Sequence, residues 1–167
     1  MLKLLQRNCC SGHAMQTQHT IVTLNRLTRL CRDGEDFCRL CARRLEHPDL
    51  RALLRQRSEE WGRLGDELQA LVLLLGGEPA TTGTLGARAL RAWTLLRTMA
   101  FGASDMLLLE EWHGMQEQAL RRYEEAAGGY LPERIRRTIS LQADRVADRY
   151  EQIGVLRGRY TIRSQNA

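Results

Sequence analysis

The chain has 167 residues, of which 43% are hydrophobic and 27% are charged, and its formal net charge is +5. That length favours a single domain with a sizeable core, and the composition is ordinary for a soluble globular protein. Aromatic residues account for 5% of the chain and only three prolines occur. Because β-branched residues are sparse as well, the composition argues against a β-sheet and predicts an all-α protein.

The sequence offers no segment for membrane insertion or secretion. Its longest apolar run, Leu71–Leu75, is far too short to cross a bilayer, which needs about 20 residues. The N-terminal segment lacks the apolar core of a secretory signal. Five cysteines, an odd number at irregular spacing, do not form the pattern of a disulfide framework. We therefore expect a cytoplasmic protein with no membrane association.

The first half of the chain predicts an extension followed by two helices. Residues 1–18 show no sustained periodicity and are predicted to be a disordered extension, with Met15 as an alternative start of the native protein. The first helix runs from about 20 to 46 and ends before Pro48, because proline cannot continue a helix. The second runs from about 49 to 75 and ends at a pair of glycines.

Three more helices are predicted, over about 85–101, 105–127 and 132–160, followed by a frayed tail, 161–167. Very short turns join the first helix to the second and the last two helices to each other, so each pair should be an antiparallel hairpin. Two hairpins joined by one long crossover make the ferritin-like topology. The predicted fold is therefore an all-α, ferritin-like four-helix bundle over residues 19–160, with a short extra helix in the crossover.

The last predicted helix carries a continuous stripe at alternating steps of three and four residues. Its members are Ile135, Ile139, Gln142, Val146, Arg149, Ile153, Leu156 and Tyr160. Gln142 and Arg149 interrupt an apolar seam, and an arginine in a bundle core is costly unless a carboxylate or another acceptor meets it. We predict a buried polar layer in the middle of the bundle, formed by Arg57, Arg63, Gln142 and Arg149.

Several short segments resemble one bacterial family in their order and spacing. They are Leu24-Asn25, Asp33-Gly34, Gly76-Gly77-Glu78-Pro79, Arg91-Ala92-Trp93, Leu109-Glu110-Glu111, Tyr123, Leu131-Pro132, Gln142 and Leu156-Arg157. Over about residues 22–160, the set resembles the bacterial ferritin-like four-helix-bundle family that is catalogued as a domain of unknown function. The resemblance implies a ferritin-like fold, a bacterial cytoplasmic protein and no established reaction.

The chain also departs from that family's pattern. Leu90 stands where a histidine usually precedes Arg-x-Trp, and a late His-Asp pair is replaced by Tyr150-Glu151. The family's acidic run Glu-Arg-Gly-Glu-Asp reads His113-Gly114-Met115-Gln116-Glu117. Ligand or proton chemistry that these positions serve in relatives is therefore not carried over to this chain.

A ferritin-type dimetal site needs one glutamate from each of two helices and a Glu-x-x-His pair from each of the other two. The candidate ligands are Glu35, Glu60 and the pair Glu110-x-x-His113. Because only one of the two required histidines is present, we favour a protein without a cofactor, with iron or manganese at these four residues as the alternative. In the favoured interpretation, arginines neutralise the inward carboxylates through bidentate hydrogen bonds.

Cys31, Cys38 and Cys41 occupy seam positions of the first predicted helix. The pair Cys38-x-x-Cys41 could suggest a redox or zinc site, but it falls in mid-helix and no second cysteine pair completes a zinc site. A buried free cysteine behaves as a small hydrophobic residue. We therefore interpret all three as core packing.

These patterns lead to three hypotheses of function. The favoured one is a non-catalytic bundle, with a stress-related role left open, that acts through assembly as a homodimer or through an unknown protein partner. The first alternative is an iron- or manganese-binding protein for storage or oxidation. The second is a nucleic-acid-associated stress protein, since residues 131–167 hold eight arginines and four acids. We interpret that basic strip as a solvated helix face instead.

Overall fold

The computed structural model describes residues 2–45, 47–84 and 105–165, and these form four helices and no strand. The helices are α1 (Leu2–Ala42), α2 (Pro48–Leu74), α4 (Asp105–Ala127) and α5 (Glu133–Gln165). The all-α prediction is confirmed. The short helix predicted over 85–101 falls outside the described residues. No helix in the described part of the chain combines the length and the apolar character that a membrane span needs.

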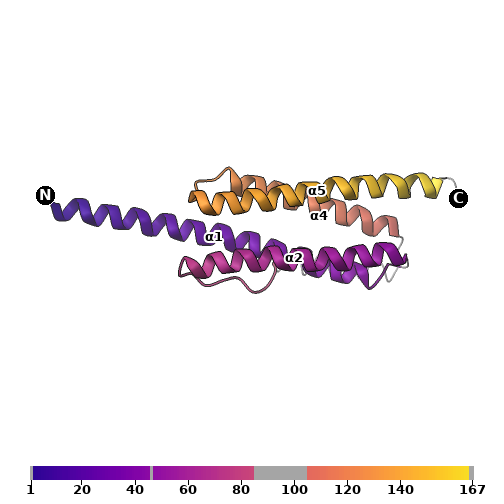
Figure 1. Ribbon diagram of the computed structural model, residues 1–167, viewed down its shortest axis with the longest axis horizontal. Coiled ribbons are helices and arrows are strands. Elements are labelled where there is room, and N and C mark those ends of the chain that lie inside the picture. Colours follow the sequence, from indigo (N-terminus) through magenta and orange to yellow (C-terminus); the bar gives the residue numbers. More distant parts are fainter. Residues whose placement is uncertain (1, 46, 85–104, 166–167) are drawn as a thin grey trace.

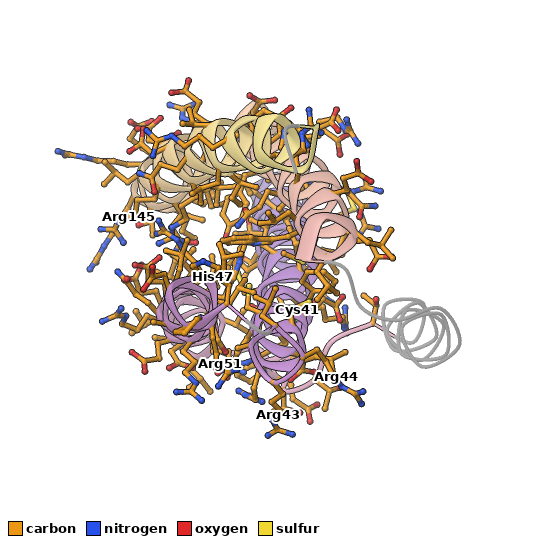
Figure 2. All side chains as sticks on the ribbon, turned by 90° about the vertical axis from the view of Figure 1, so that its right-hand side faces the viewer. Cys41, Arg43, Arg44, His47, Arg51 and Arg145 are labelled. Carbon is orange, nitrogen blue, oxygen red and sulfur yellow. The ribbon has the colours of Figure 1, made fainter. Side chains whose placement is uncertain are left out.

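The four helices pack as two pairs, α1 with α2 and α4 with α5, in agreement with a four-helix bundle (Figure 1). Within each pair the connection is short, so the helices run antiparallel. Contacts between α1 and α4 join the two pairs. Seen along the bundle, α4 lies over α1 and α5 lies over α2, so all four helices surround one interior (Figure 2).

The helix ends follow from proline and glycine positions. Pro48 occupies the first turn of α2, where its missing N–H costs no intrahelical hydrogen bond. Gly76 follows the last turn of α2 with a φ of +72°, a conformation that other residues rarely adopt. Its N–H bonds the carbonyl of Leu73 at 2.9 Å, and the N–H of Gly77 bonds that of Val72 at 3.0 Å. This pair of bonds is the Schellman arrangement, which ends the helix.

Both terminal helices are longer than the periodicity predicts. α1 begins at Leu2 instead of near residue 20, and α5 continues to Gln165, past the expected end near residue 160. The N-terminal part of α1 extends beyond the ends of the other helices (Figure 1). A helix outside the bundle needs no apolar seam. The leucines, glutamine, lysine and arginine of this segment favour a helix by intrinsic propensity, and it contains no proline.

The core consists of the seams that the sequence predicts. On α1, the buried face at three- and four-residue steps consists of Leu24, Leu27, Cys31, Gly34, Cys38 and Cys41. Cys41 points into the interior, whereas Arg43 and Arg44 point away from it (Figure 2). The buried residues of the other helices include Leu50, Leu54, Trp61, Leu64, Leu68, Leu109, Trp112, Tyr123, Ile135, Ile139, Val146 and Ile153. Gln142 and Arg149 are buried among them.

Candidate functional site: two buried polar layers

A chain of hydrogen bonds crosses the middle of the bundle and involves all four helices. We call Cys31, Tyr123, Gln142 and Glu67 the first polar layer. The Tyr123 hydroxyl donates to Oε1 of Gln142 at 2.9 Å, and the Gln142 amide donates to Oε2 of Glu67 at 2.8 Å and to the Leu64 carbonyl at 3.4 Å. The Cys31 Sγ lies 3.1 Å from the Tyr123 oxygen. Because Tyr123 gives its proton to Gln142, the Cys31 thiol is the donor to Tyr123.

The first polar layer is built from neutral groups at its centre. Burial raises the pKa of Cys31 to about 12, although its hydrogen bond with Tyr123 and the charge of Arg32 act in the opposite direction. Burial also raises the pKa of Tyr123 well above its usual value. Both groups therefore keep their protons at neutral pH. A protonated thiol is a poor nucleophile, so this layer fixes the helices without offering an attacking group.

The second polar layer lies one heptad along the bundle and contains a buried ion pair. We define it as Glu60, Arg57 and Arg149, with Gln116 at the same level on α4. The Arg149 Nε lies 3.1 Å from Oε2 of Glu60, and Nη1 of Arg57 donates to the same oxygen at 2.7 Å. Burial tends to raise the pKa of Glu60, but the hydrogen bond from Arg57 and the charge of Arg149 outweigh it, so the pKa is lowered. Glu60 is therefore ionised at neutral pH.

The position of Gln116 follows from the helix register. Gln116 precedes Tyr123 by one heptad on α4, and Arg149 follows Gln142 by one heptad on α5. Since α4 and α5 run antiparallel, both steps lead about 10.5 Å in the same direction from the Tyr123–Gln142 bond. Gln116 and Arg149 therefore belong to one layer. The charge of Arg149 also acts on Cys38, which follows Cys31 by one heptad on α1.

Some polar atoms of the second layer have no hydrogen-bond partner among the described residues. They are both amide atoms of Gln116, which is 0% exposed, and Nη1 of Arg149, which is 8% exposed. Unsatisfied buried donors and acceptors are rare in folded proteins, because each costs roughly 1–3 kcal/mol of desolvation.

Glu35 and Glu60, two of the candidate metal ligands, are already engaged by arginines. Glu35 accepts from Arg32 at 3.0 Å and also pairs with Arg39. Arg32 in turn reaches Asp66 on α2 at 2.6 Å, which ties α1 to α2 at the bundle surface. Glu60 is paired with Arg57 and Arg149, as described above.

The other two candidate ligands lie apart from this network. Glu110 is exposed on α4, and the ring of His113 packs on that of Tyr150 with a centroid separation of 4.6 Å. The His113 Nδ1 lies 3.4 Å from Nη1 of Arg157. Burial and the charge of Arg157 lower the pKa of His113, so its ring is neutral at pH 7.

The described residues contain no group of three or more histidine, cysteine, aspartate or glutamate side chains placed to hold a metal ion. The carboxylate oxygens of Glu35 and Glu60 pair with guanidinium groups. In the described part of the chain, no hydrogen bond or ion pair joins either glutamate to Glu110 or His113. The donor set therefore does not fit a ferritin-type dimetal centre, which needs several carboxylates converging with histidines.

Arg63 does not belong to the buried layer, contrary to the prediction. It is exposed on α2, whereas Arg57 is half-buried and Arg149 is buried. The reason is helical geometry. Trp61 faces the core, and a residue two positions further along is rotated by about 200°, which turns it to the outside.

The sequence interpretation missed Tyr123 and Gln116 as members of the polar layers. A signal for them exists, because Trp112, Gln116, Ala119 and Tyr123 recur at steps of four, three and four on one face of α4. All four are buried. Gln116 stands out there as the one amide in an otherwise apolar or aromatic stripe.

A large groove of about 1130 Å³ runs between α1 and α4, to one side of the polar layers. Its floor includes Leu27, Leu30, Phe37, Trp61 and Met115. Its edge on α1 carries mainly positive charge, from Arg26 and Arg29 beside Asp33. Its edge on α4 carries Glu111 and Glu125 beside Arg122. The groove thus combines an apolar floor with two edges of opposite charge bias.

No functionally curated protein matches this chain. Residues 19–128 match a family defined only as a domain of unknown function, DUF2383, a range that covers the larger part of the chain. The match includes α2, which carries Glu60, and ends before α5, which supplies Gln142 and Arg149. Over its larger part, from His19 through the end of α4, this chain therefore belongs to the DUF2383 family.

Proposed function

We propose that the protein is a non-catalytic, ferritin-like bundle that works by assembly, with two copies joined through the groove between α1 and α4. In this proposal an arginine–carboxylate layer stands where relatives of the fold would hold metal. The groove is the observation on which the proposed assembly rests. The second polar layer is the observation that argues against a catalytic role.

The ferritin-like part of the proposal rests on connectivity. Two antiparallel pairs are joined by a connection that leaves α2 after Leu74 and reaches α4 at Asp105. A connection of that length is what a ferritin-like crossover requires. The non-catalytic part rests on chemistry, because Glu60 is compensated by two guanidinium groups and the buried thiols and Tyr123 hold their protons.

The assembly part rests on the shape and charge of the groove. An apolar trough between two helices is the kind of surface that receives the apolar face of another helix. A two-fold symmetric interface brings the same patch of both copies together, so the α1 edge of one copy can face the α4 edge of the other. The basic bias of Arg26 and Arg29 then meets the acidic bias of Glu111 and Glu125.

The test is a measurement of molar mass in solution by light scattering over a wide range of protein concentration. We expect the mass of a dimer, and we expect Leu30→Arg and Met115→Arg to shift it to that of a monomer. Both residues are half-buried in the groove. The matched controls are Leu141→Arg and Val155→Arg, which change exposed hydrophobic residues on α5 and should leave the dimer intact.

Two results would overturn the proposal. One is a wild-type protein that is monomeric at every concentration. The other is a dimer that the groove variants leave unchanged, which would move the interface to another surface. A monomer whose stability falls only in Leu30→Arg and Met115→Arg would show that the groove is filled from within the same chain, and it would also reject the assembly.

A further inference from the structure

We propose that the second polar layer is a binding site for a small monovalent anion, such as a halide, held between the guanidinium group of Arg149 and the side-chain amide of Gln116. The inference concerns the interior of a single bundle and does not depend on pairing of two copies. It rests on the charge count of the layer, on its unpartnered donors and on the register that brings those donors together.

The charge count leaves one positive charge in excess. Arg57 and Arg149 both contact Oε2 of Glu60, so two guanidinium groups share a single carboxylate. The other hydrogen bond of Arg57 goes to Gln152, which is neutral. No other carboxylate of the described residues forms an ion pair with Arg57 or Arg149, and the segment 85–104 contains no aspartate or glutamate. An uncompensated buried charge is strongly unfavourable, and an anion removes that cost.

The unpartnered atoms supply donors for such an anion. The Nη1 of Arg149 and the Nε2 of Gln116 are buried and donate to no described residue. Both are hydrogen-bond donors, and the guanidinium group also carries the charge. The heptad step from the Tyr123–Gln142 bond brings both side chains to the same level of the bundle. Donors together with a net positive charge favour an anion and disfavour a metal cation at this place.

The size of the ligand is limited by its surroundings. Two fully buried residues lie near this level: Cys38 on α1, on which the charge of Arg149 acts, and Trp112 on α4, one helical turn before Gln116. A monovalent anion with a small hydration cost is better suited to such a place than a phosphate, because one excess positive charge balances one negative charge. Bromide is the probe of choice, since it can also be located by anomalous diffraction.

The first test is urea unfolding of protein dialysed into a halide-free zwitterionic buffer, repeated at increasing sodium bromide. For the wild type above saturation, we expect the apparent unfolding constant to fall about tenfold for each tenfold rise in bromide. Arg149→Met should lose this dependence. Arg145→Met removes an exposed arginine from the same helix and is the matched control, which should keep it. Equal bromide dependence in all three proteins would reject the site.

A second variant keeps the proposal testable if Arg149→Met folds poorly. Gln116→Glu places a carboxylate at the level of Arg149 and so provides the missing negative charge from within the chain. We expect this variant to be at least as stable as the wild type in halide-free buffer at pH 7, and to be insensitive to bromide. A marked loss of stability in Gln116→Glu would mean that the layer has no positive charge to spare, and would overturn the proposal.

Crystals grown or soaked in sodium bromide provide the direct observation. The expected result is an anomalous peak within hydrogen-bond distance of Nη1 of Arg149 and Nε2 of Gln116 in the wild type, absent from Arg149→Met. A water molecule at that place, or a direct bond from Arg149 to Gln116 in the presence of bromide, would overturn the assignment.

Discussion

Tyr123 on α4 donates its hydroxyl proton to Gln142 on α5 across 2.9 Å, and both side chains are essentially inaccessible to water. The amide oxygen of Gln142 can only accept, so the direction of this bond is fixed. The same reasoning fixes the whole first polar layer, from the Cys31 thiol to Tyr123, then to Gln142 and on to Glu67. A directional chain through all four helices selects one relative register, because a shift of any helix would break at least one bond.

Removing the Tyr123 hydroxyl should show how much this chain of hydrogen bonds contributes to the stability of the fold. Tyr123→Phe leaves the Gln142 oxygen and the Cys31 thiol buried without their partner, and we expect a loss of roughly 1–3 kcal/mol in the free energy of unfolding. Urea unfolding followed by circular dichroism measures it. Tyr130→Phe removes the same group from an exposed tyrosine and is the control. Equal stability of the two variants would show that the buried chain contributes nothing.

The two sides of the buried ion pair should respond unequally to truncation. Glu60→Ala leaves Arg57 and Arg149 without their shared carboxylate, and breaking a buried pair in this way costs on the order of 3–5 kcal/mol. Arg149→Met should cost less, because Glu60 keeps the hydrogen bond from Arg57 and the unpartnered Nη1 disappears. Urea unfolding of both variants at pH 7 gives the order. An equal or reversed order would contradict the charge count of the layer.

The sequence predicts this bundle well where periodicity carries the information. The seam of α5 identified Gln142 and Arg149 as inward polar residues because a three-four spacing leaves them no other face. The spacing on α5 could not predict which carboxylates these two residues would meet. Whether Arg149 meets Glu60 on α2 or Glu35 on α1 depends on how α5 is placed and aligned against these two helices, and no local pattern fixes that placement.

Two other differences have local physical causes. Tyr123 was not assigned to the polar layer, although a tyrosine hydroxyl that is buried needs a partner and therefore indicates a polar neighbour. The N-terminal residues of α1 lack a seam, so periodicity gave no reason to predict a helix from Leu2. Intrinsic propensity alone supports helical structure there, and that signal is weak over a single short segment.

The stability of the protein should fall in acid through Glu60. Its folded-state pKa lies below the ordinary value of 4.5, so the folded state binds fewer protons than the unfolded state. The contribution of this group is therefore complete above about pH 4.5 and is lost as the pH falls through the folded-state pKa. In urea titrations, the gap in stability between wild type and Glu60→Gln should narrow as the pH drops below this value. A gap independent of pH would show that the Glu60 charge is not stabilised by folding.

The three core cysteines should be inert in the folded protein. Burial raises the pKa of Cys31 and Cys41 to about 12 and that of Cys38 well above its usual value, so almost no thiolate exists at neutral pH. After brief alkylation at pH 7.5, peptide mass mapping should find all three unmodified. The same treatment in denaturant should modify them fully. Rapid native modification of Cys38 would indicate that the bundle opens at the second polar layer.

Substitution of Gly34 by any larger residue should destabilise the fold, because Gly34 lies close to the ring of Trp61. A Cβ at this position of α1 would lie 2.8 Å from the Cδ2 and Cε2 atoms of the Trp61 indole, which is itself buried. Gly34→Ala must displace that ring, and overpacking of this kind costs about 1–3 kcal/mol. The control is Gly158→Ala on an exposed part of α5, where a Cβ meets no atom of the described residues within 4 Å. There the higher helix propensity of alanine should stabilise the protein by up to about 1 kcal/mol. In thermal unfolding, we expect the first substitution to lower the stability and the second to raise it. Unchanged stability in Gly34→Ala would mean that α1 and α2 can move apart at this level without a cost in free energy.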